Sequence, residues 1–186
     1  YLGCPILSSM EVKKIGVNEE GYDVCIDRNA AEADGIILGC RIKPHTAFRG
    51  PYESGLMKMM AIGLAKHKGC SLLHQQGFET FAEIIPEAAR AFLERMPVLF
   101  AVGVVQNAYD EISHLRVLRK EDIVEGDREL LTIAKQQFPR FRFDNIDLLI
   151  LDRIGKDISG EGADPNVTGR GFMPYFQDDF HARKMM

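Results

Sequence analysis

Residues 35–74 constrain the fold of this chain more than any other segment. They begin with the apolar run GIILGC, continue through a loop rich in cations, glycine and proline, and then take on helical spacing. Strand, loop and helix in this order are the building unit of α/β sheets. In open α/β sheets, ligands bind beyond the carboxyl ends of the strands, where loops lead into helices. The segment therefore predicts both a fold class and the place of a ligand site.

Strand and helix patterns alternate over the rest of the chain. Apolar runs predict strands at residues 11–17, 22–26, 35–40, 98–106, 112–119 and 147–151. Apolar residues at helical spacing predict helices at residues 55–66, 78–95 and 122–138, with a helical turn at 29–34. Polar turns at residues 18–21 and 107–111 predict two hairpins. We therefore expect an α/β fold, a layered sandwich with a mixed sheet.

Composition and charge exclude several classes of protein. Of the 186 residues, 46% are hydrophobic and 27% are charged, which is typical of a globular protein. The net charge of −4 provides no basic field for nucleic acid. The longest apolar runs, such as residues 98–105, are too short to span a bilayer. The scattered cysteines form no CxxC motif and favour reduced thiols in a cytoplasmic protein.

The ends of the chain indicate a fragment. The sequence starts at Tyr1 without a methionine and stops after the run HARKMM. We expect residues 1–186 to be an α/β region of a longer, two-domain protein. In an alternative division, residues 1–54 end an N-terminal domain and residues 55–186 begin a C-terminal domain.

The loop at residues 41–53 holds most of the candidate site residues. Its positively charged and titratable side chains, suited to an anionic small molecule, are Arg41, Lys43, His45 and Arg49. Some of these cations are expected to pair with Glu53 or Asp164. Ser54 is expected to cap the helix that follows.

Three side chains are candidates for a role in chemistry, and each also has a structural interpretation. Lys58 lies among apolar residues, so burial can lower its pKa and make it a nucleophile; alternatively it extends to solvent. His45 can transfer a proton near neutral pH, or it can hold loop backbone. His74 follows two leucines, as a packed histidine would, and no His, Cys or Asp stands at metal-site spacing from it.

A glycine-rich segment, residues 155–171, follows the last predicted strand. Its composition lets backbone approach a ligand closely, and long loops of this kind are often functional. The alternative is a flexible surface loop. The pattern of a phosphate-binding P-loop is absent. The polar side chains of the segment include Asp164, Asn166, Thr168 and Arg170.

Two runs, RIKPHTAFRGPYESGLMKM and DPNVTGR, give the chain a family resemblance. They resemble the nickel-dependent lactate racemase family, and more closely an uncharacterised branch of it that has both runs. In that family a nickel-pincer nucleotide is attached to a lysine, a histidine completes the nickel coordination, and two further histidines transfer protons on opposite faces of the substrate. The matching residues follow in the family's order, as Pro44, His45, Ser54, Gly55, Lys58 and His74.

The resemblance implies a role for each matching residue. Lys58 would carry the pincer covalently, with Ser54 and Gly55 beside it, and His74 would bind the nickel. The pincer supplies ligands of its own, so one protein histidine suffices. His45 would be a proton-transfer histidine. The substrate, a small carboxylate, would be bound by Arg41, Lys43, Arg49, Asn166 and Arg170. The cations among these exceed what one carboxylate needs, so some would contact the nucleotide phosphate or pair with Glu53 or Asp164.

Two departures from the family pattern separate the functional hypotheses. Ser8 and Ser9 lie where the family has its other catalytic histidine, and Asn166 and Arg170 are the nearest substitutes for its late glutamine and lysine. The first hypothesis is a racemase- or epimerase-like enzyme that acts on a 2-hydroxy acid or sugar acid by hydride transfer to the nickel-pincer nucleotide. The alternative is an anion- or nucleotide-binding α/β protein without racemase activity. A third is a related, non-racemising pincer enzyme.

Overall fold

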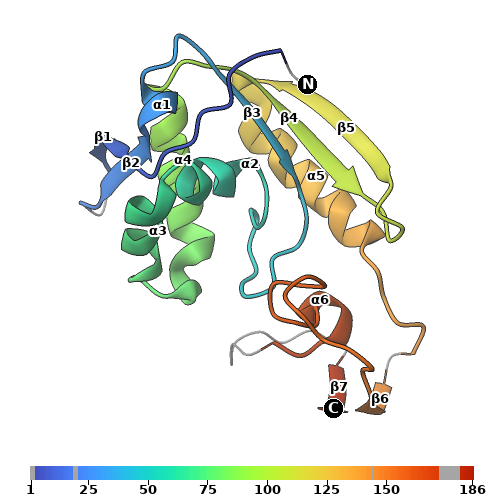
Figure 1. The fold of residues 1–186 in the computed structure, drawn as a ribbon. Helices are drawn as coiled ribbons and strands as arrows, with labels where there is room; N and C mark the ends of the chain where they lie inside the picture. The colour runs from blue at the N-terminus through green and yellow to red at the C-terminus, as the bar shows by residue number, and fades with distance from the viewer. Residues whose placement is uncertain (1–2, 19–20, 144, 172–180) are drawn as a thin grey trace.

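A three-stranded mixed sheet forms the centre of the protein (Figure 1). The computed structural model describes residues 3–18, 21–143, 145–171 and 181–186. Strand β3 (Ile36–Arg41) runs parallel to β4 (Val98–Gln106), which pairs antiparallel with β5 (Ile112–Arg119). The predicted α/β class with a mixed sheet is therefore confirmed.

Helix α5 (Ile123–Gln137) covers one face of this sheet. Its apolar stripe meets the inward-facing residues of β4, and Gly103 lets the helix approach closely, since a Cβ there would lie 2.6 Å from Leu130 Cδ1. On the opposite face of the sheet, Ile37, Leu115 and Val117 are exposed. A short turn, η3 (Lys120–Asp122), leads from β5 into α5.

A second group of elements packs beside the sheet (Figure 1). It contains the antiparallel pair β1 (Val12–Val17) and β2 (Asp23–Asp27), and the helical elements α1 (Arg28–Ala31), α2 (Leu56–Lys58), η1 (Met59–Gly63), α3 (Lys66–His74), η2 (Phe78–Thr80) and α4 (Phe81–Arg95). The aromatic residues of α4, Phe81 and Phe92, are almost fully buried in one continuous core with Met57 and Met60. Within the described residues, every helix is too short or too polar to cross a bilayer.

The expected single helix at residues 55–66 is wrong. The chain forms α2 and the π-turn η1, and then starts a new helix, α3, at Lys66, where φ is +54°. Asp27 causes the break. Its N–H donates to the Leu64 carbonyl at 2.6 Å, and its carboxylate pairs with Lys66 Nζ at 3.2 Å. This long-range tie overrides local helix propensity.

The C-terminal part differs from expectation in three places. The predicted strand at 147–151 lies earlier, as β6 (Asn145–Leu149), and it pairs in parallel with an unpredicted strand, β7 (His181–Met185). The glycine-rich segment contains a helical turn, α6 (Pro165–Thr168), whose N-terminus is capped by the Asp164 side chain.

Of the predicted turn at 18–21, residues 19 and 20 lie outside the described residues.

Packing at Gly103 gives a test of the fold. We expect Gly103→Ala to lower the free energy of unfolding by about 1–3 kcal/mol, because the added methyl group overlaps Leu130 and Ile42. Gly39→Ala is the matched control: it lies on β3, and its Cβ would meet no atom within 4 Å. Urea denaturation of both variants measures the difference. Equal destabilisation would contradict the described packing of α5 on the sheet.

Candidate active site

Residues 43–54 form a closed loop between β3 and α2. Lys43 N–H donates to the Ser54 carbonyl at 2.9 Å, and Ser54 N–H donates to the Lys43 carbonyl at 3.2 Å, so the loop begins and ends at one bridge. Loops whose ends meet in this way hold their shape through their own side chains. This loop leaves the carboxyl end of β3, where a ligand site was expected.

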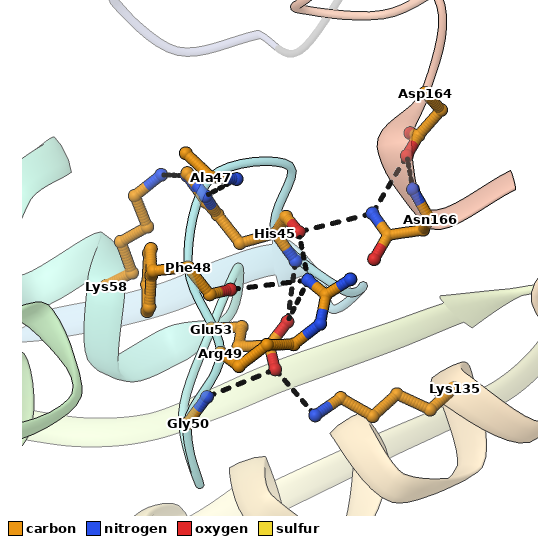
Figure 2. A network of polar contacts seen from close by, with 10 residues as sticks. All are labelled: His45, Ala47, Phe48, Arg49, Gly50, Glu53, Lys58, Lys135, Asp164 and Asn166. Carbon is orange, nitrogen blue, oxygen red and sulfur yellow. Dashed lines mark hydrogen bonds and ion pairs between the residues drawn. The ribbon is translucent and has the colours of Figure 1, made fainter. Parts of the chain in front are cut away.

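Glu53 holds the loop in shape from within. Its carboxylate is fully buried and accepts hydrogen bonds from His45 N–H at 2.7 Å and Gly50 N–H at 3.3 Å. It also pairs with Lys135 of α5 at 2.5 Å and with Arg49 at 3.8 Å (Figure 2). A buried carboxylate requires such partners. The expected pairing of a loop cation with Glu53 is confirmed for Arg49.

Lys58 and His45 contact each other directly. Lys58 Nζ lies 2.7 Å from His45 Nε2, and Ala47 N–H donates to His45 Nδ1 at 3.0 Å (Figure 2). Because Nδ1 accepts a hydrogen bond, the proton of a neutral imidazole stands on Nε2. Lys58 must then accept that proton in the hydrogen bond, which only an uncharged amine can do.

The electrostatics of the pair agree with this protonation state. Burial, followed by repulsion from Lys58 whenever that amine is charged, lowers the pKa of His45 from 6.5 to about 3. Burial also lowers the pKa of the Lys58 amine, although Cys70 opposes this. Both groups are therefore driven toward their uncharged forms, which is the state in which a lysine is a nucleophile.

His74 lies close to this pair and has one ring nitrogen available. Its Nδ1 lies 2.8 Å from the Cys70 carbonyl one turn earlier in α3, so Nδ1 carries the proton and Nε2 keeps its lone pair. A series of ring contacts connects the two histidines: the His45 ring is tilted against Phe48, and the contacts of Phe48 with Phe81 and of Phe81 with His74 are edge-to-face. A positive charge on His74 would lower the pKa of His45. A backbone partner on the second nitrogen is typical of metal-binding histidines.

The predicted cofactor neighbours Ser54 and Gly55 lie at the start of α2, but the expected Ser54 cap is wrong. The Asp127 carboxylate, from α5, accepts instead from the N–H groups of Leu56 at 2.9 Å and Met57 at 3.1 Å. A Cβ at Gly55 would collide with this carboxylate, so glycine is required there. Asp127 thus positions the turn that carries Lys58.

Two predicted anion-binding residues, Arg41 and Lys43, line a cavity of about 360 Å³ at the carboxyl ends of β3 and β4. Arg41 donates to Gln106 at 2.5 Å and lies 4.0 Å from Asp110. Phe138, Leu151 and other apolar residues form the wall of the cavity. His45 and Lys58 do not line it, yet the charge of Lys43 lowers the pKa of both. Lys43 therefore both lines this cavity and acts electrostatically on His45 and Lys58.

The other three predicted anion-binding residues lie elsewhere. Arg49 and Asn166 line a second cavity, and Asn166 Nδ2 donates to the His45 carbonyl at 3.2 Å (Figure 2). Arg170 donates to the carbonyls of Ala182 at 3.1 Å and Arg183 at 2.8 Å, so it connects the tail to β7. The structure thus brings together Lys58, His45 and His74, and distributes the predicted anion-binding residues over separate places.

Two positioning residues have no counterpart in the site expected from the sequence. Asp127 lies on the core-facing stripe of α5, between Ile123 and Leu130, where a carboxylate is unusual. A carboxylate on an otherwise apolar helix stripe was the sequence signal from which Asp127 could have been identified. Lys135 gave no such signal, because a lysine near the end of an amphipathic helix is ordinary.

The uncharged state of Lys58 has a direct consequence for its reactivity. In competitive labelling with acetic anhydride, we expect the pH profile of Lys58 acetylation to have its midpoint below that of the exposed Lys156. The reactive amine is present above its own pKa and is lost as the pH falls below it. Mass spectrometry of the labelled peptides measures both profiles. Coincident midpoints would contradict a depressed Lys58 pKa.

Comparisons with known proteins support the fold. Neither family models nor curated proteins give a match. Among solved structures, the chain is similar to the lactate racemase apoprotein from Thermoanaerobacterium thermosaccharolyticum, with a TM-score of 0.51 and 18% identity. The alignment covers 75% of this chain and 34% of that one, so the chain spans about a third of that protein's length. At this identity, the likeness shows a common fold with part of a lactate racemase.

Proposed function

We propose that this chain belongs to a racemase- or epimerase-like enzyme that acts on a 2-hydroxy acid or a sugar acid. The observation that carries the proposal is the contact between Lys58 and His45, in which hydrogen-bond geometry requires an uncharged amine. The likeness of the fold to a lactate racemase supports it. The sequence resemblance to the nickel-dependent lactate racemases supplies the reaction class.

The residues present fit a nickel-pincer nucleotide. Lys58 is in the uncharged form that covalent attachment needs, and Ser54 and Gly55 adjoin it. His74 presents Nε2 as a metal ligand, since Cys70 already satisfies Nδ1. When bound, the group would accept a hydride from the α-carbon of the substrate and return it to either face.

His45 is the proposed proton-transfer residue, and its hydrogen bonds set a condition on that role. An acylated Lys58 nitrogen has no basic lone pair, so His45 Nε2–H would be released toward the substrate oxygen. To take the hydroxyl proton, Nε2 must first be without its own hydrogen. That requires the Nδ1–H tautomer, and therefore opening of the contact with Ala47 N–H. Lys43, whose charge acts on both residues, is the proposed partner of the substrate carboxylate.

Intact mass and nickel content test this proposal. The full-length protein is purified from cells that make the pincer cofactor, as wild type, Lys58→Ala and Lys68→Ala. We expect a mass increase that maps to Lys58, with about one nickel per chain, in the wild type and in Lys68→Ala. Lys68 is the control because it is an exposed lysine of α3. The Lys58→Ala protein should show neither the adduct nor racemisation of a hydroxy acid.

A second candidate function is anion or nucleotide binding without racemase activity. The two cavities lined by cations favour it, since they lie beside the loop and do not include Lys58. An unmodified Lys58 without nickel, under conditions that load a known lactate racemase, would contradict the enzyme proposal and support this candidate.

A further inference from the structure

The Lys58 side chain combines the features that an amine needs to react with a carbonyl compound. It is half-buried rather than sealed in the core. Its nitrogen lies 2.7 Å from His45 Nε2, and the hydrogen bond from Ala47 N–H to His45 Nδ1 leaves the ring proton on Nε2 (Figure 2). An uncharged lysine adds to a carbonyl carbon, whereas an ammonium has no lone pair to do so. Lys58 is therefore a nucleophile with a proton donor beside it.

His45 is held with its Nε2 toward Lys58. Its backbone N–H donates to the Glu53 carboxylate at 2.7 Å, and its ring lies against the Phe48 ring, with centroids 4.4 Å apart. If the Lys58 nitrogen attacked a carbonyl carbon, the oxygen on that carbon would come within reach of the same Nε2–H. The histidine can therefore serve as the proton donor and acceptor of such a reaction.

Lys43 supplies a charge that selects among carbonyl compounds. Its side chain is half-buried, and its charge acts on both His45 and Lys58, whose pKa values it lowers. The buried Glu53 of the same loop pairs instead with Arg49 and Lys135. A carboxylate next to the reacting carbonyl would therefore meet a positive charge whose field reaches both members of the pair. A 2-oxo acid has its carboxylate in that position.

We propose that Lys58 forms an imine with 2-oxo acids when the protein carries no cofactor. The Lys58 nitrogen turns its lone pair from His45 to the carbonyl carbon, so that an N–C bond forms as the C–O π bond breaks. The oxygen takes the Nε2 proton of His45, and the nitrogen returns one of its own protons to Nε2. In a second passage, His45 protonates the hydroxyl group, which leaves as water. His45 then takes the last nitrogen proton as the C=N bond forms, so the histidine ends as it began.

Reductive trapping of the cofactor-free, full-length protein tests this proposal. Pyruvate or acetone is added with cyanoborohydride at pH 7, and peptide mass spectrometry follows the adduct at each lysine. Pyruvate is a 2-oxo acid, and acetone is a small ketone without a carboxylate. We expect pyruvate to label Lys58 about tenfold or more faster than the exposed Lys68. The pyruvate-to-acetone ratio should also be larger at Lys58 than at Lys68, a comparison that cancels the intrinsic reactivities of the two ketones.

Three variants separate the roles of the neighbouring residues. His45→Ala should slow pyruvate trapping at Lys58 about tenfold or more, because the proton donor is lost. Lys43→Gln should lower the pyruvate-to-acetone ratio at Lys58 toward the ratio at Lys68. Lys156→Gln is the matched control: it removes the same charge from an exposed position and should leave the ratio at Lys58 unchanged. Circular dichroism checks that each variant is folded.

Equal labelling of Lys58 and Lys68 by pyruvate would overturn the proposal, as would undiminished trapping in His45→Ala. A pyruvate-to-acetone ratio that is the same at both lysines would overturn the choice of 2-oxo acids. The inference rests on the contact of Lys58 with His45 and not on the pincer, so its failure is distinguishable from a failure of the cofactor to load. In protein that does carry the pincer, no imine should form at Lys58, because the amine is no longer free.

Discussion

The buried carboxylate of Glu53 is the interaction on which the geometry of the candidate active site depends. It accepts the N–H of His45, which orients the histidine, and it pairs with Lys135, which fixes the loop against α5. Without it, the loop would lose the carboxylate that holds His45 N–H, Gly50 N–H and Lys135 together. A buried ion pair of this kind contributes little net stability, but removing one partner is costly. Its role here is to specify one loop conformation.

A second constraint acts on α2, which is too short to be stable alone. Asp127 accepts its first N–H groups, and Gly55 leaves room for that carboxylate. The 43–54 loop is thus fixed to α5 by the ion pair of Glu53 with Lys135. The first turn of α2 is fixed to the same helix by its hydrogen bonds to Asp127. Helix α5, which contains neither residue, consequently determines how Lys58 meets His45.

Local pattern was sufficient for the central sheet, for α4 and for α5, because each has a complete hydrophobic period of its own. The break at Lys66 and the strand β7 were not predictable in this way, since each depends on a partner distant in sequence: Asp27 for the first and β6 for the second. Lys58, His45 and His74 could be chosen from the order of motifs. The directions of the cationic side chains could not be predicted from the sequence. Arg170, for example, donates to backbone carbonyls that no sequence pattern reveals.

The central claim is that Lys58 and His45 form an uncharged pair in which His45 Nε2–H donates to the Lys58 amine. The most direct test is ¹⁵N NMR of the His45 ring in labelled full-length protein across a pH series. We expect a protonated Nε2 and an unprotonated Nδ1 at pH 7, with ring titration displaced from 6.5 toward about 3. A ring protonated on Nδ1, or one that titrates near 6.5, would contradict the account.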